Sequence, residues 1–144
     1  MKASQQFCTF HVGPLFVGLE IERVQEVLRP QPMTRVPLAA REVSGLINLR
    51  GRIVTALDLR RRLDLPDRAR ESQPMNVVVR TSEGVVSLLV DSVGDVVNTT
   101  GETFERPPET LAASARRLIR GVHKLPERLL LVLDADEAAE IPSA

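Results

Sequence analysis

Apolar and polar side chains alternate along the first part of the chain, and a period of two is typical of a β-strand with one buried face. In residues 15–21 every second position is apolar. Residues 5–12 carry the aromatic and β-branched side chains that strands favour, and Gly13-Pro14 separates the two segments. These residues predict two strands joined by a tight turn.

Similar patterns recur along the rest of the chain. Strands are predicted at residues 46–49, 53–57, 76–79, 85–90, 119–123 and 129–133, with an extended piece at 33–37. Turn-forming residues separate them, which makes about eight to ten short strands at fairly regular spacing. This arrangement predicts an all-β sandwich or barrel with minor α-helix, rather than alternating strands and helices.

A few segments depart from the strand pattern. In residues 24–28 the apolar side chains lie at the i, i+3 and i+4 positions of one or two helical turns, and Glu26 points away from them. Residues 134–141 predict a terminal helix with Asp134 as its N-cap. Residues 111–118 predict a helical turn or a loop, 63–74 an exposed loop and 99–101 a turn, while 91–97 fit no single period.

Composition narrows the class of protein. The 144 residues suit one domain or two small subdomains, and 43% apolar residues are enough to form a core. The 19 basic and 19 acidic side chains give a formal net charge of zero, so nonspecific nucleic-acid binding is not expected. The N-terminal residues lack the apolar core of a signal peptide, and no apolar run approaches the roughly 20 residues of a spanning helix. A soluble cytoplasmic protein without direct membrane contact is therefore expected.

Residue types suited to catalysis are scarce and scattered. His11 and His123 fall in different predicted strands, with no acidic residue at metal-ligand spacing, and Cys8 is the single cysteine. Neither a phosphate-binding G-x-x-x-x-G-K-[ST] loop nor a G-x-S-x-G nucleophile motif is present. The chain is predicted to be a binding module, not an enzyme, with no cofactor and no metal.

The segment from 43 to 62 stands out as a hairpin. Two apolar runs flank Arg50-Gly51, and glycine between such runs supplies the positive φ of a tight turn. Asp58 closes the second run, and the basic residues 60–62 follow it. This pattern predicts a buried hairpin that presents Arg50 at a charged tip, and a solvated exit at residues 60–62.

The same hairpin carries a family resemblance. Residues 45–54, Gly-Leu-Ile-Asn-Leu-Arg-Gly-Arg-Ile-Val, and residues 57–60, Leu-Asp-Leu-Arg, resemble the signature segment of CheW-type chemotaxis coupling proteins. Other segments resemble that family in the same order, namely 7–10, 16–21, 24–27, 34–37, 89–93, 119–122 and 129–134. The resemblance spans about residues 5–140, within a single CheW-like domain at 1–144. Thr55 departs from it, because the family usually has proline there.

The resemblance implies a fold, a function and partners. The fold would be two intertwined five-stranded, SH3-like β-barrel subdomains. The protein would be a non-catalytic adaptor that couples the cytoplasmic tips of methyl-accepting chemoreceptors to the regulatory domain of a CheA-type histidine kinase. It would work in the cytoplasm, recruited to membrane-associated receptor arrays. An alternative is a CheW-like scaffold for a non-motility chemosensory pathway controlling pili or biofilm.

Four residues are candidate partner contacts by this resemblance. Val24 and Glu26 match the element at the family's receptor-facing groove, and Val96 would line the groove from the other subdomain. Arg50 matches the signature arginine. Its planar fork suits recognition of a partner, and it could equally tie the turn to a carboxylate such as Glu20 or Asp58. Val24 and Val96 could instead be core residues, and Glu26 a solvated carboxylate.

The remaining signature residues suggest structural roles. They are Gly45, Asn48, Gly51 and Asp58, of which Asn48 and Gly51 are expected to form the turn. A rival hypothesis is a small β-barrel enzyme or ligand-binding protein with a polar pocket around His11 or His123. A β-barrel nucleic-acid binder is less favoured, because the charges balance and the chain has no Trp or Tyr for base stacking.

Overall fold

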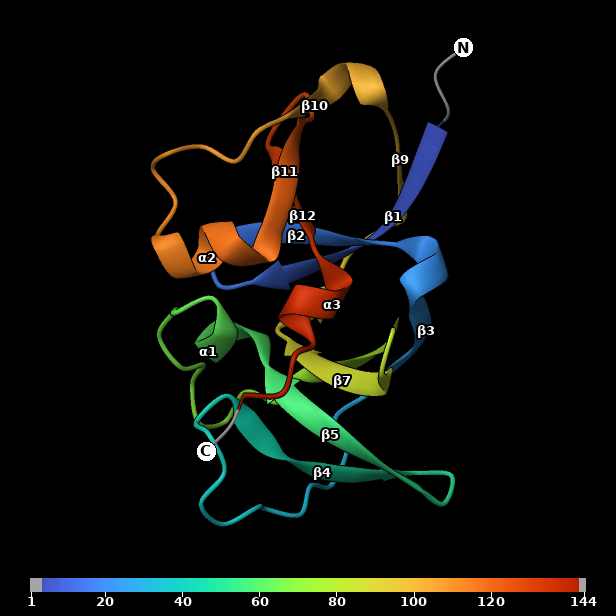
Figure 1. Ribbon diagram of the computed structural model, residues 1–144, viewed down its shortest axis with the longest axis vertical. Coiled ribbons are helices and arrows are strands. Elements are labelled where there is room, and N and C mark those ends of the chain that lie inside the picture. The colour runs from blue at the N-terminus through green and yellow to red at the C-terminus, as the bar shows by residue number, and fades with distance from the viewer. Residues whose placement is uncertain (1–3, 143–144) are drawn as a thin grey trace.

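Two β-sheets and three short helices form the protein in the computed structural model, which describes residues 4–142 (Figure 1). The first sheet is built from both ends of this range: β1 (Ser4–Val12), β2 (Leu15–Glu20), β8 (Ser92–Val93), β9 (Val97–Thr100), β10 (Phe104–Glu105), β11 (Ile119–Lys124) and β12 (Leu129–Leu133). Its strand order is β10-β11-β12-β2-β1-β8, and β9 pairs with β1. All of these pairs are antiparallel except the parallel pair of β12 and β2.

The second sheet comes from the middle of the chain. It contains β3 (Val24–Leu28), β4 (Val43–Leu49), β5 (Arg52–Asp58), β6 (Met75–Thr81) and β7 (Gly84–Val90), in the order β3-β6-β7-β5-β4. In Figure 1 the strands labelled β1, β2, β11 and β12 lie above those labelled β4, β5 and β7. The chain thus leaves the first sheet after β2, builds the second, and returns at β8.

Three α-helices and two 3-10 helices join the strands. They are α1 (Leu59–Arg62), α2 (Ala113–Leu118) and α3 (Ala135–Ala138), with 3-10 turns at Ile21–Arg23 and Gly101–Thr103. Asp58 caps α1 by accepting a hydrogen bond from the Arg60 amide at 3.0 Å, and Asp134 caps α3 by accepting one from the Glu137 amide at 3.1 Å. The predicted N-cap at Asp134 is confirmed.

The main apolar core lies where the two sheets meet. Phe10 and Val17 of the first sheet pack in one cluster with Leu57 and Val77 of the second, and all four are fully buried. A side chain of this kind contributes about 1.5–3 kcal/mol on full burial. Each sheet also has a smaller cluster of its own, around Ile47 in the second and around Phe7, Phe16, Leu130 and Val132 in the first. The predicted all-β fold with minor helix is confirmed, as two sheets with a shared core.

Two local predictions were wrong. Residues 24–28 form strand β3 instead of a helix, because they pair with β6 along the sheet edge. A register shift between Val24 and Glu26 interrupts the alternation there, so the apolar spacing imitates a helical period. Residues 99–101 are not a free turn, because Thr99 and Thr100 extend β9 along β1.

Residues 63–74 are not wholly an exposed loop. Leu63 is buried in the main core, and the Arg68 side chain is only 10% exposed in an ion pair with Asp58. No helix among residues 4–142 is long and apolar enough to cross a membrane.

Candidate functional site

The β4–β5 turn presents the arginine at the hairpin tip. Arg50 and Gly51 both have positive φ, 51° and 87°, which is the backbone of a two-residue type I′ turn. The Asn48 side-chain oxygen accepts a hydrogen bond from the Gly51 amide at 2.8 Å, which satisfies a donor inside the turn. The predicted turn at Arg50-Gly51 is confirmed, and Arg50 extends from it with 67% of its side chain exposed.

Glu26 reaches Arg50 from the opposite edge of the second sheet. It lies on edge strand β3, where Glu26 is aligned with Val78 of β6. The guanidinium of Arg50 donates to its carboxylate, and the Gln25 side-chain amide donates to the same oxygen at 3.3 Å. The structure therefore joins two predicted partner contacts, which are 24 residues apart in sequence, into one ion pair.

This ion pair determines the electrostatics of the site. The hydrogen bond from Arg50 lowers the pKa of the Glu26 carboxyl, and the bond from Gln25 acts in the same direction. Glu26 therefore stays ionised at neutral and mildly acidic pH. Glu20 and Asp58 had been suggested as carboxylates that could pair with Arg50. The structure pairs those two acids with Arg120 and Arg68 instead.

The two candidate valines lie in different parts of the fold. Val24, at the start of β3, is half-buried against the main core. Val96 precedes β9 of the first sheet and is 49% exposed, so it is not a core residue. The structure brings Glu26 and Arg50 together, and it leaves Val96 exposed in the segment between β8 and β9.

Two exposed apolar side chains close in sequence to Glu26 and Arg50 were not singled out in the sequence analysis. Val27 follows Glu26 on β3, and Ile53 lies next to the hairpin turn on β5 with 66% of its surface exposed. The prediction of a wholly buried hairpin was wrong for Ile53. Its neighbour Val54 is buried, so the alternation along β5 was the signal that could have placed Ile53 on the outer face.

Gly45 has a packing role at the outer edge of β4. Thr34 exchanges two backbone hydrogen bonds with Leu46, each 2.8 Å long. A Cβ atom at Gly45 would lie 2.8 Å from the Thr34 carbonyl oxygen. The absence of a side chain at Gly45 thus lets the predicted extended segment around Thr34 lie against the hairpin.

A second charged cluster lies at the junction of the two sheets. Arg60 binds both oxygens of Asp91, at 2.9 and 2.7 Å, and the Gly13 amide donates to the same carboxylate at 2.6 Å. Arg68 reaches Asp91 at 3.3 Å and Asp58 at 3.1 Å. We call Asp58, Arg60, Arg68 and Asp91 the junction cluster.

The basic residues after β5 are therefore not a solvated exit, and that prediction was wrong. Arg60 belongs to the junction cluster. Arg61 pairs with Asp67 at 3.0 Å and donates to the Arg41 carbonyl oxygen at 2.7 Å. Arg62 donates to carbonyl oxygens at the end of α3, where the last turn of a helix offers unpaired acceptors. The short helix α1 aims these three side chains in different directions.

Groups suited to catalysis do not converge. His123 is fully buried, and its ring nitrogens lie 2.7 Å from the Thr103 hydroxyl and 3.4 Å from the Thr99 hydroxyl. His11 packs against the ring of Phe16 on the neighbouring strand, with centroids 5.2 Å apart. Both histidines thus lie in packed positions away from each other. Within the part of the chain that the structure describes, no three His, Cys, Asp or Glu side chains could hold a metal ion together.

Known proteins resemble this chain in sequence and in fold. A family model for the CheW-like domain matches residues 6–141. The chemotaxis protein CheW of Klebsiella aerogenes is 30% identical over 133 residues, which cover 92% of this chain and 80% of that protein. The chemotaxis protein CheW of Bacillus subtilis is 26% identical over 144 residues, which cover 100% of this chain and 92% of that protein.

A solved structure shares the fold. The crystal structure of the scaffolding protein TtCheW from Thermoanaerobacter tengcongensis matches with a TM-score of 0.85 at 23% identity, over 96% of this chain and 94% of that one. The names of these relatives agree with the prediction of a non-catalytic binding protein.

Proposed function

Because the CheW-like family model matches almost the whole chain, this protein belongs to the CheW-like family, and we propose that it joins chemoreceptor tips to the regulatory domain of a CheA-type histidine kinase. Proteins of this family are scaffolds without catalytic activity. Its place of work would be the cytoplasm, where receptor arrays at the membrane would recruit it. In this proposal the two sheets act as two SH3-like barrel subdomains, each offering a surface to a partner.

The observation that carries the proposal is the exposed ion pair between Arg50 and Glu26. It joins the hairpin signature to the β3 element, the two segments that supply three of the four candidate partner contacts. Exposed apolar side chains occur close by in sequence, at Val27 next to Glu26 on β3 and at Ile53 just after the hairpin turn on β5. Apolar contact surrounded by oriented charge is common in protein interfaces, where the charges set orientation. We propose that this surface receives the receptor tip, with Val24 and Val96 as further contacts.

Calorimetric titration with a receptor-tip fragment and with a kinase regulatory domain tests the proposal. Glu26→Ala and Arg50→Ala are each expected to weaken receptor-tip binding about tenfold or more, as loss of a central interface contact does. Glu105→Ala is the matched control, because Glu105 forms an exposed ion pair with Lys124 at 3.0 Å on the other sheet. That control should bind like the wild type.

A charge exchange separates direct contact from support of the hairpin. The double variant Glu26→Arg/Arg50→Glu restores an ion pair with its charges reversed. If the partner contacts these charges, the double variant binds as poorly as either single variant. Recovered binding would mean that the pair only holds β3 to the hairpin. The adaptor proposal fails if folded wild-type protein binds neither a kinase domain nor a receptor tip from its own organism.

A further inference from the structure

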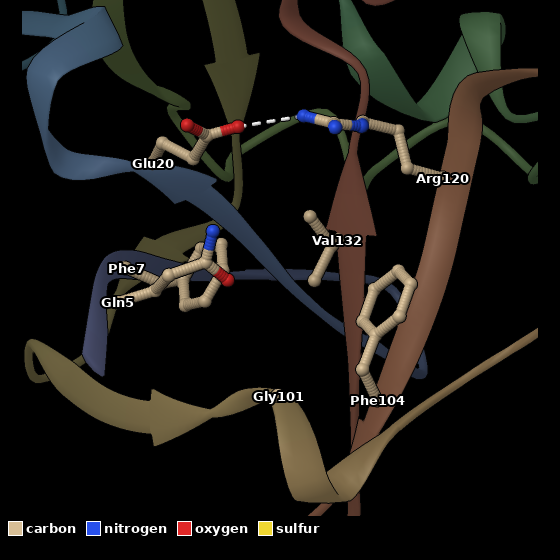
Figure 2. A pocket seen from close by; sticks show the side chains of 7 residues that line it. All are labelled: Gln5, Phe7, Glu20, Gly101, Phe104, Arg120 and Val132. Atoms are coloured by element: carbon tan, nitrogen blue, oxygen red, sulfur yellow. Dashed lines mark hydrogen bonds and ion pairs between the residues drawn. The ribbon is translucent and has the colours of Figure 1, made fainter. Parts of the chain in front are cut away.

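A hollow of about 450 Å³ opens on the first sheet (Figure 2), and neither Arg50 nor Glu26 lines it. It is lined by Gln5, Phe7, Glu20, Gly101, Phe104, Arg120 and Val132. These residues come from β1, β2, β10, β11 and β12 and from the 3-10 turn before β10. The volume is in the range of small-molecule sites in proteins.

The apolar part of the hollow is built from residues that the fold holds firmly. Phe7 and Val132 are buried in the small cluster of the first sheet. The ring of Phe104 lies directly over Gly121, where a Cβ atom would collide with it. Phe104 also packs against buried His123, with ring centroids 5.1 Å apart. Phe104 is 45% exposed, so its ring supplies most of the apolar surface that is open to solvent, backed by the buried Phe7 and Val132.

Two opposite charges lie along one side of this apolar surface. Arg120 donates to the Glu20 carboxylate at 2.7 Å, and Figure 2 shows the two side chains reaching toward one another across the hollow. Arg120 lies at a register shift in β11, between Ile119 and Gly121. Such an irregularity redirects a side chain out of the normal alternation of a strand.

This ion pair can open at little cost. Glu20 and Arg120 are 30% and 55% exposed, and ion pairs in such positions contribute little to stability. Opening it leaves one carboxylate and one guanidinium side by side beside an apolar surface. A ligand with a single charge would pair with one of them only, whereas a ligand with adjacent positive and negative groups would pair with both.

We propose that the hollow binds a free α-amino acid with an apolar side chain. The ammonium group pairs with Glu20, the carboxylate pairs with the donor fork of Arg120, and the side chain packs mainly on the exposed ring of Phe104. Charge-assisted hydrogen bonds of this type are the strong ones, and the arginine fork matches a carboxylate. This site is independent of the adaptor function proposed above.

Calorimetric titration of the full chain tests the site with L-phenylalanine and L-leucine. Three probes each lack one group: 3-phenylpropionate lacks the ammonium, 2-phenylethylamine lacks the carboxylate, and glycine lacks the apolar side chain. Each is expected to bind about tenfold or more weakly than L-phenylalanine, since each loses one anchoring interaction. Amide chemical shifts of Gly101 and Gly121 should move with L-phenylalanine and so locate the site.

Variants connect the binding to the two charges. Arg120→Gln and Glu20→Gln are each expected to weaken L-phenylalanine binding about tenfold or more. The matched control is Arg116→Gln, an exposed arginine of α2 that does not line the hollow. It should bind like the wild type. Circular dichroism establishes that each variant is folded.

Three results overturn the proposal. The first is the absence of heat and of shift changes with either amino acid up to about 10 mM, a concentration well above a millimolar dissociation constant. The second is unchanged binding in folded Arg120→Gln and Glu20→Gln. The third is binding of 3-phenylpropionate as tight as that of L-phenylalanine, which would identify a carboxylate site without an ammonium partner.

Discussion

The protein uses the same chemistry, arginine with carboxylate, in two places of opposite character. At the hairpin tip, Arg50 and Glu26 form an ion pair in which the arginine is mostly exposed. In the junction cluster, Arg60 and Arg68 are largely covered, and the Asp91 carboxylate receives three partners, one of them the Gly13 amide. The two places differ in burial and in the number of hydrogen bonds, and not in residue type.

Burial decides what each arrangement can do. An exposed ion pair gains little stability and can exchange its partner for another charged group. A covered charge must stay paired, because removing its partner leaves it without water or counter-ion. Burial alone would raise the pKa of the Asp91 carboxyl, but the hydrogen bonds from Arg60 and from the Gly13 amide, with the charge of Arg68, hold it below its ordinary value. The junction cluster therefore suits the fold, and the hairpin pair suits a partner.

The largest expected change in stability follows from a substitution in the junction cluster. Asp91→Ala should lower the free energy of unfolding by about 3 kcal/mol, because it leaves Arg60 and Arg68 covered without their shared carboxylate. Urea unfolding followed by circular dichroism measures this change. Glu26→Ala serves as the comparison and should leave the urea midpoint almost unchanged. Equal losses in the two variants would contradict the distinction between them.

At the hairpin tip we expect a smaller change in the free energy of unfolding, and of opposite sign. Asn-Gly is the preferred pair for a type I′ turn, and Arg50 adopts its positive φ at a steric cost of about 1 kcal/mol. Arg50→Asn relieves this cost and loses only an exposed ion pair. The free energy of unfolding should therefore rise by about 0.5 kcal/mol, measured by urea unfolding.

The same variant should bind the receptor tip about tenfold or more weakly, if that surface acts as proposed. Stability and binding would then move in opposite directions at one residue. Gly51→Ala is the control for backbone strain in the turn and should lower stability, because a side chain at φ 87° is strained. A loss of stability in Arg50→Asn would show that the ion pair outweighs the strain in the turn.

The smallest expected change in stability involves His123, a buried group that carries no charge at neutral pH. Burial lowers the pKa of His123, so the unfolded chain takes up this proton at a higher pH than the folded protein does. Stability contributed by neutral His123 is therefore complete above the unfolded pKa of about 6.5 and declines as the pH falls below it.

Urea midpoints between pH 7.5 and pH 5 should fall in the wild type and fall less in His123→Gln. The lowered pKa values of Glu26 and Asp91 place the protonation of these two carboxylates below this range. An equal decline in both proteins would assign the effect to other groups.

Much of the fold was predictable from alternation and turn residues. The strand at 15–21 has a clear alternating apolar face, those at 76–79 and 85–90 are short apolar runs between turn residues, and the structure places strands there. The Arg50-Gly51 turn was predictable because glycine accepts a backbone conformation that other residues avoid. Asp134 was a recognisable helix cap because the cap acts on residues close in sequence.

The wrong predictions share a physical cause. Strand β3 was mistaken for a helix because its register shift and its pairing with β6 involve residues about 50 positions away. The bonds of Arg60 and Arg68 to Asp91 span 31 and 23 residues, so the basic residues after β5 looked solvated. The pairing of Arg50 with Glu26 was missed for the same reason. Local patterns predicted local elements, and contacts across the two sheets decided the rest.

The chain leaves the first sheet after β2 and returns to it at β8, and this path has a consequence for synthesis on the ribosome. The parallel pair of β2 and β12 aligns Val17 with Leu131, so the first sheet stays incomplete until the ribosome has released β12. The second sheet, by contrast, uses residues 24–90 alone and can assemble earlier. A nascent chain stalled before β12 would leave this edge of β2 without its partner strand, and it would be a ready target for chaperones and proteases.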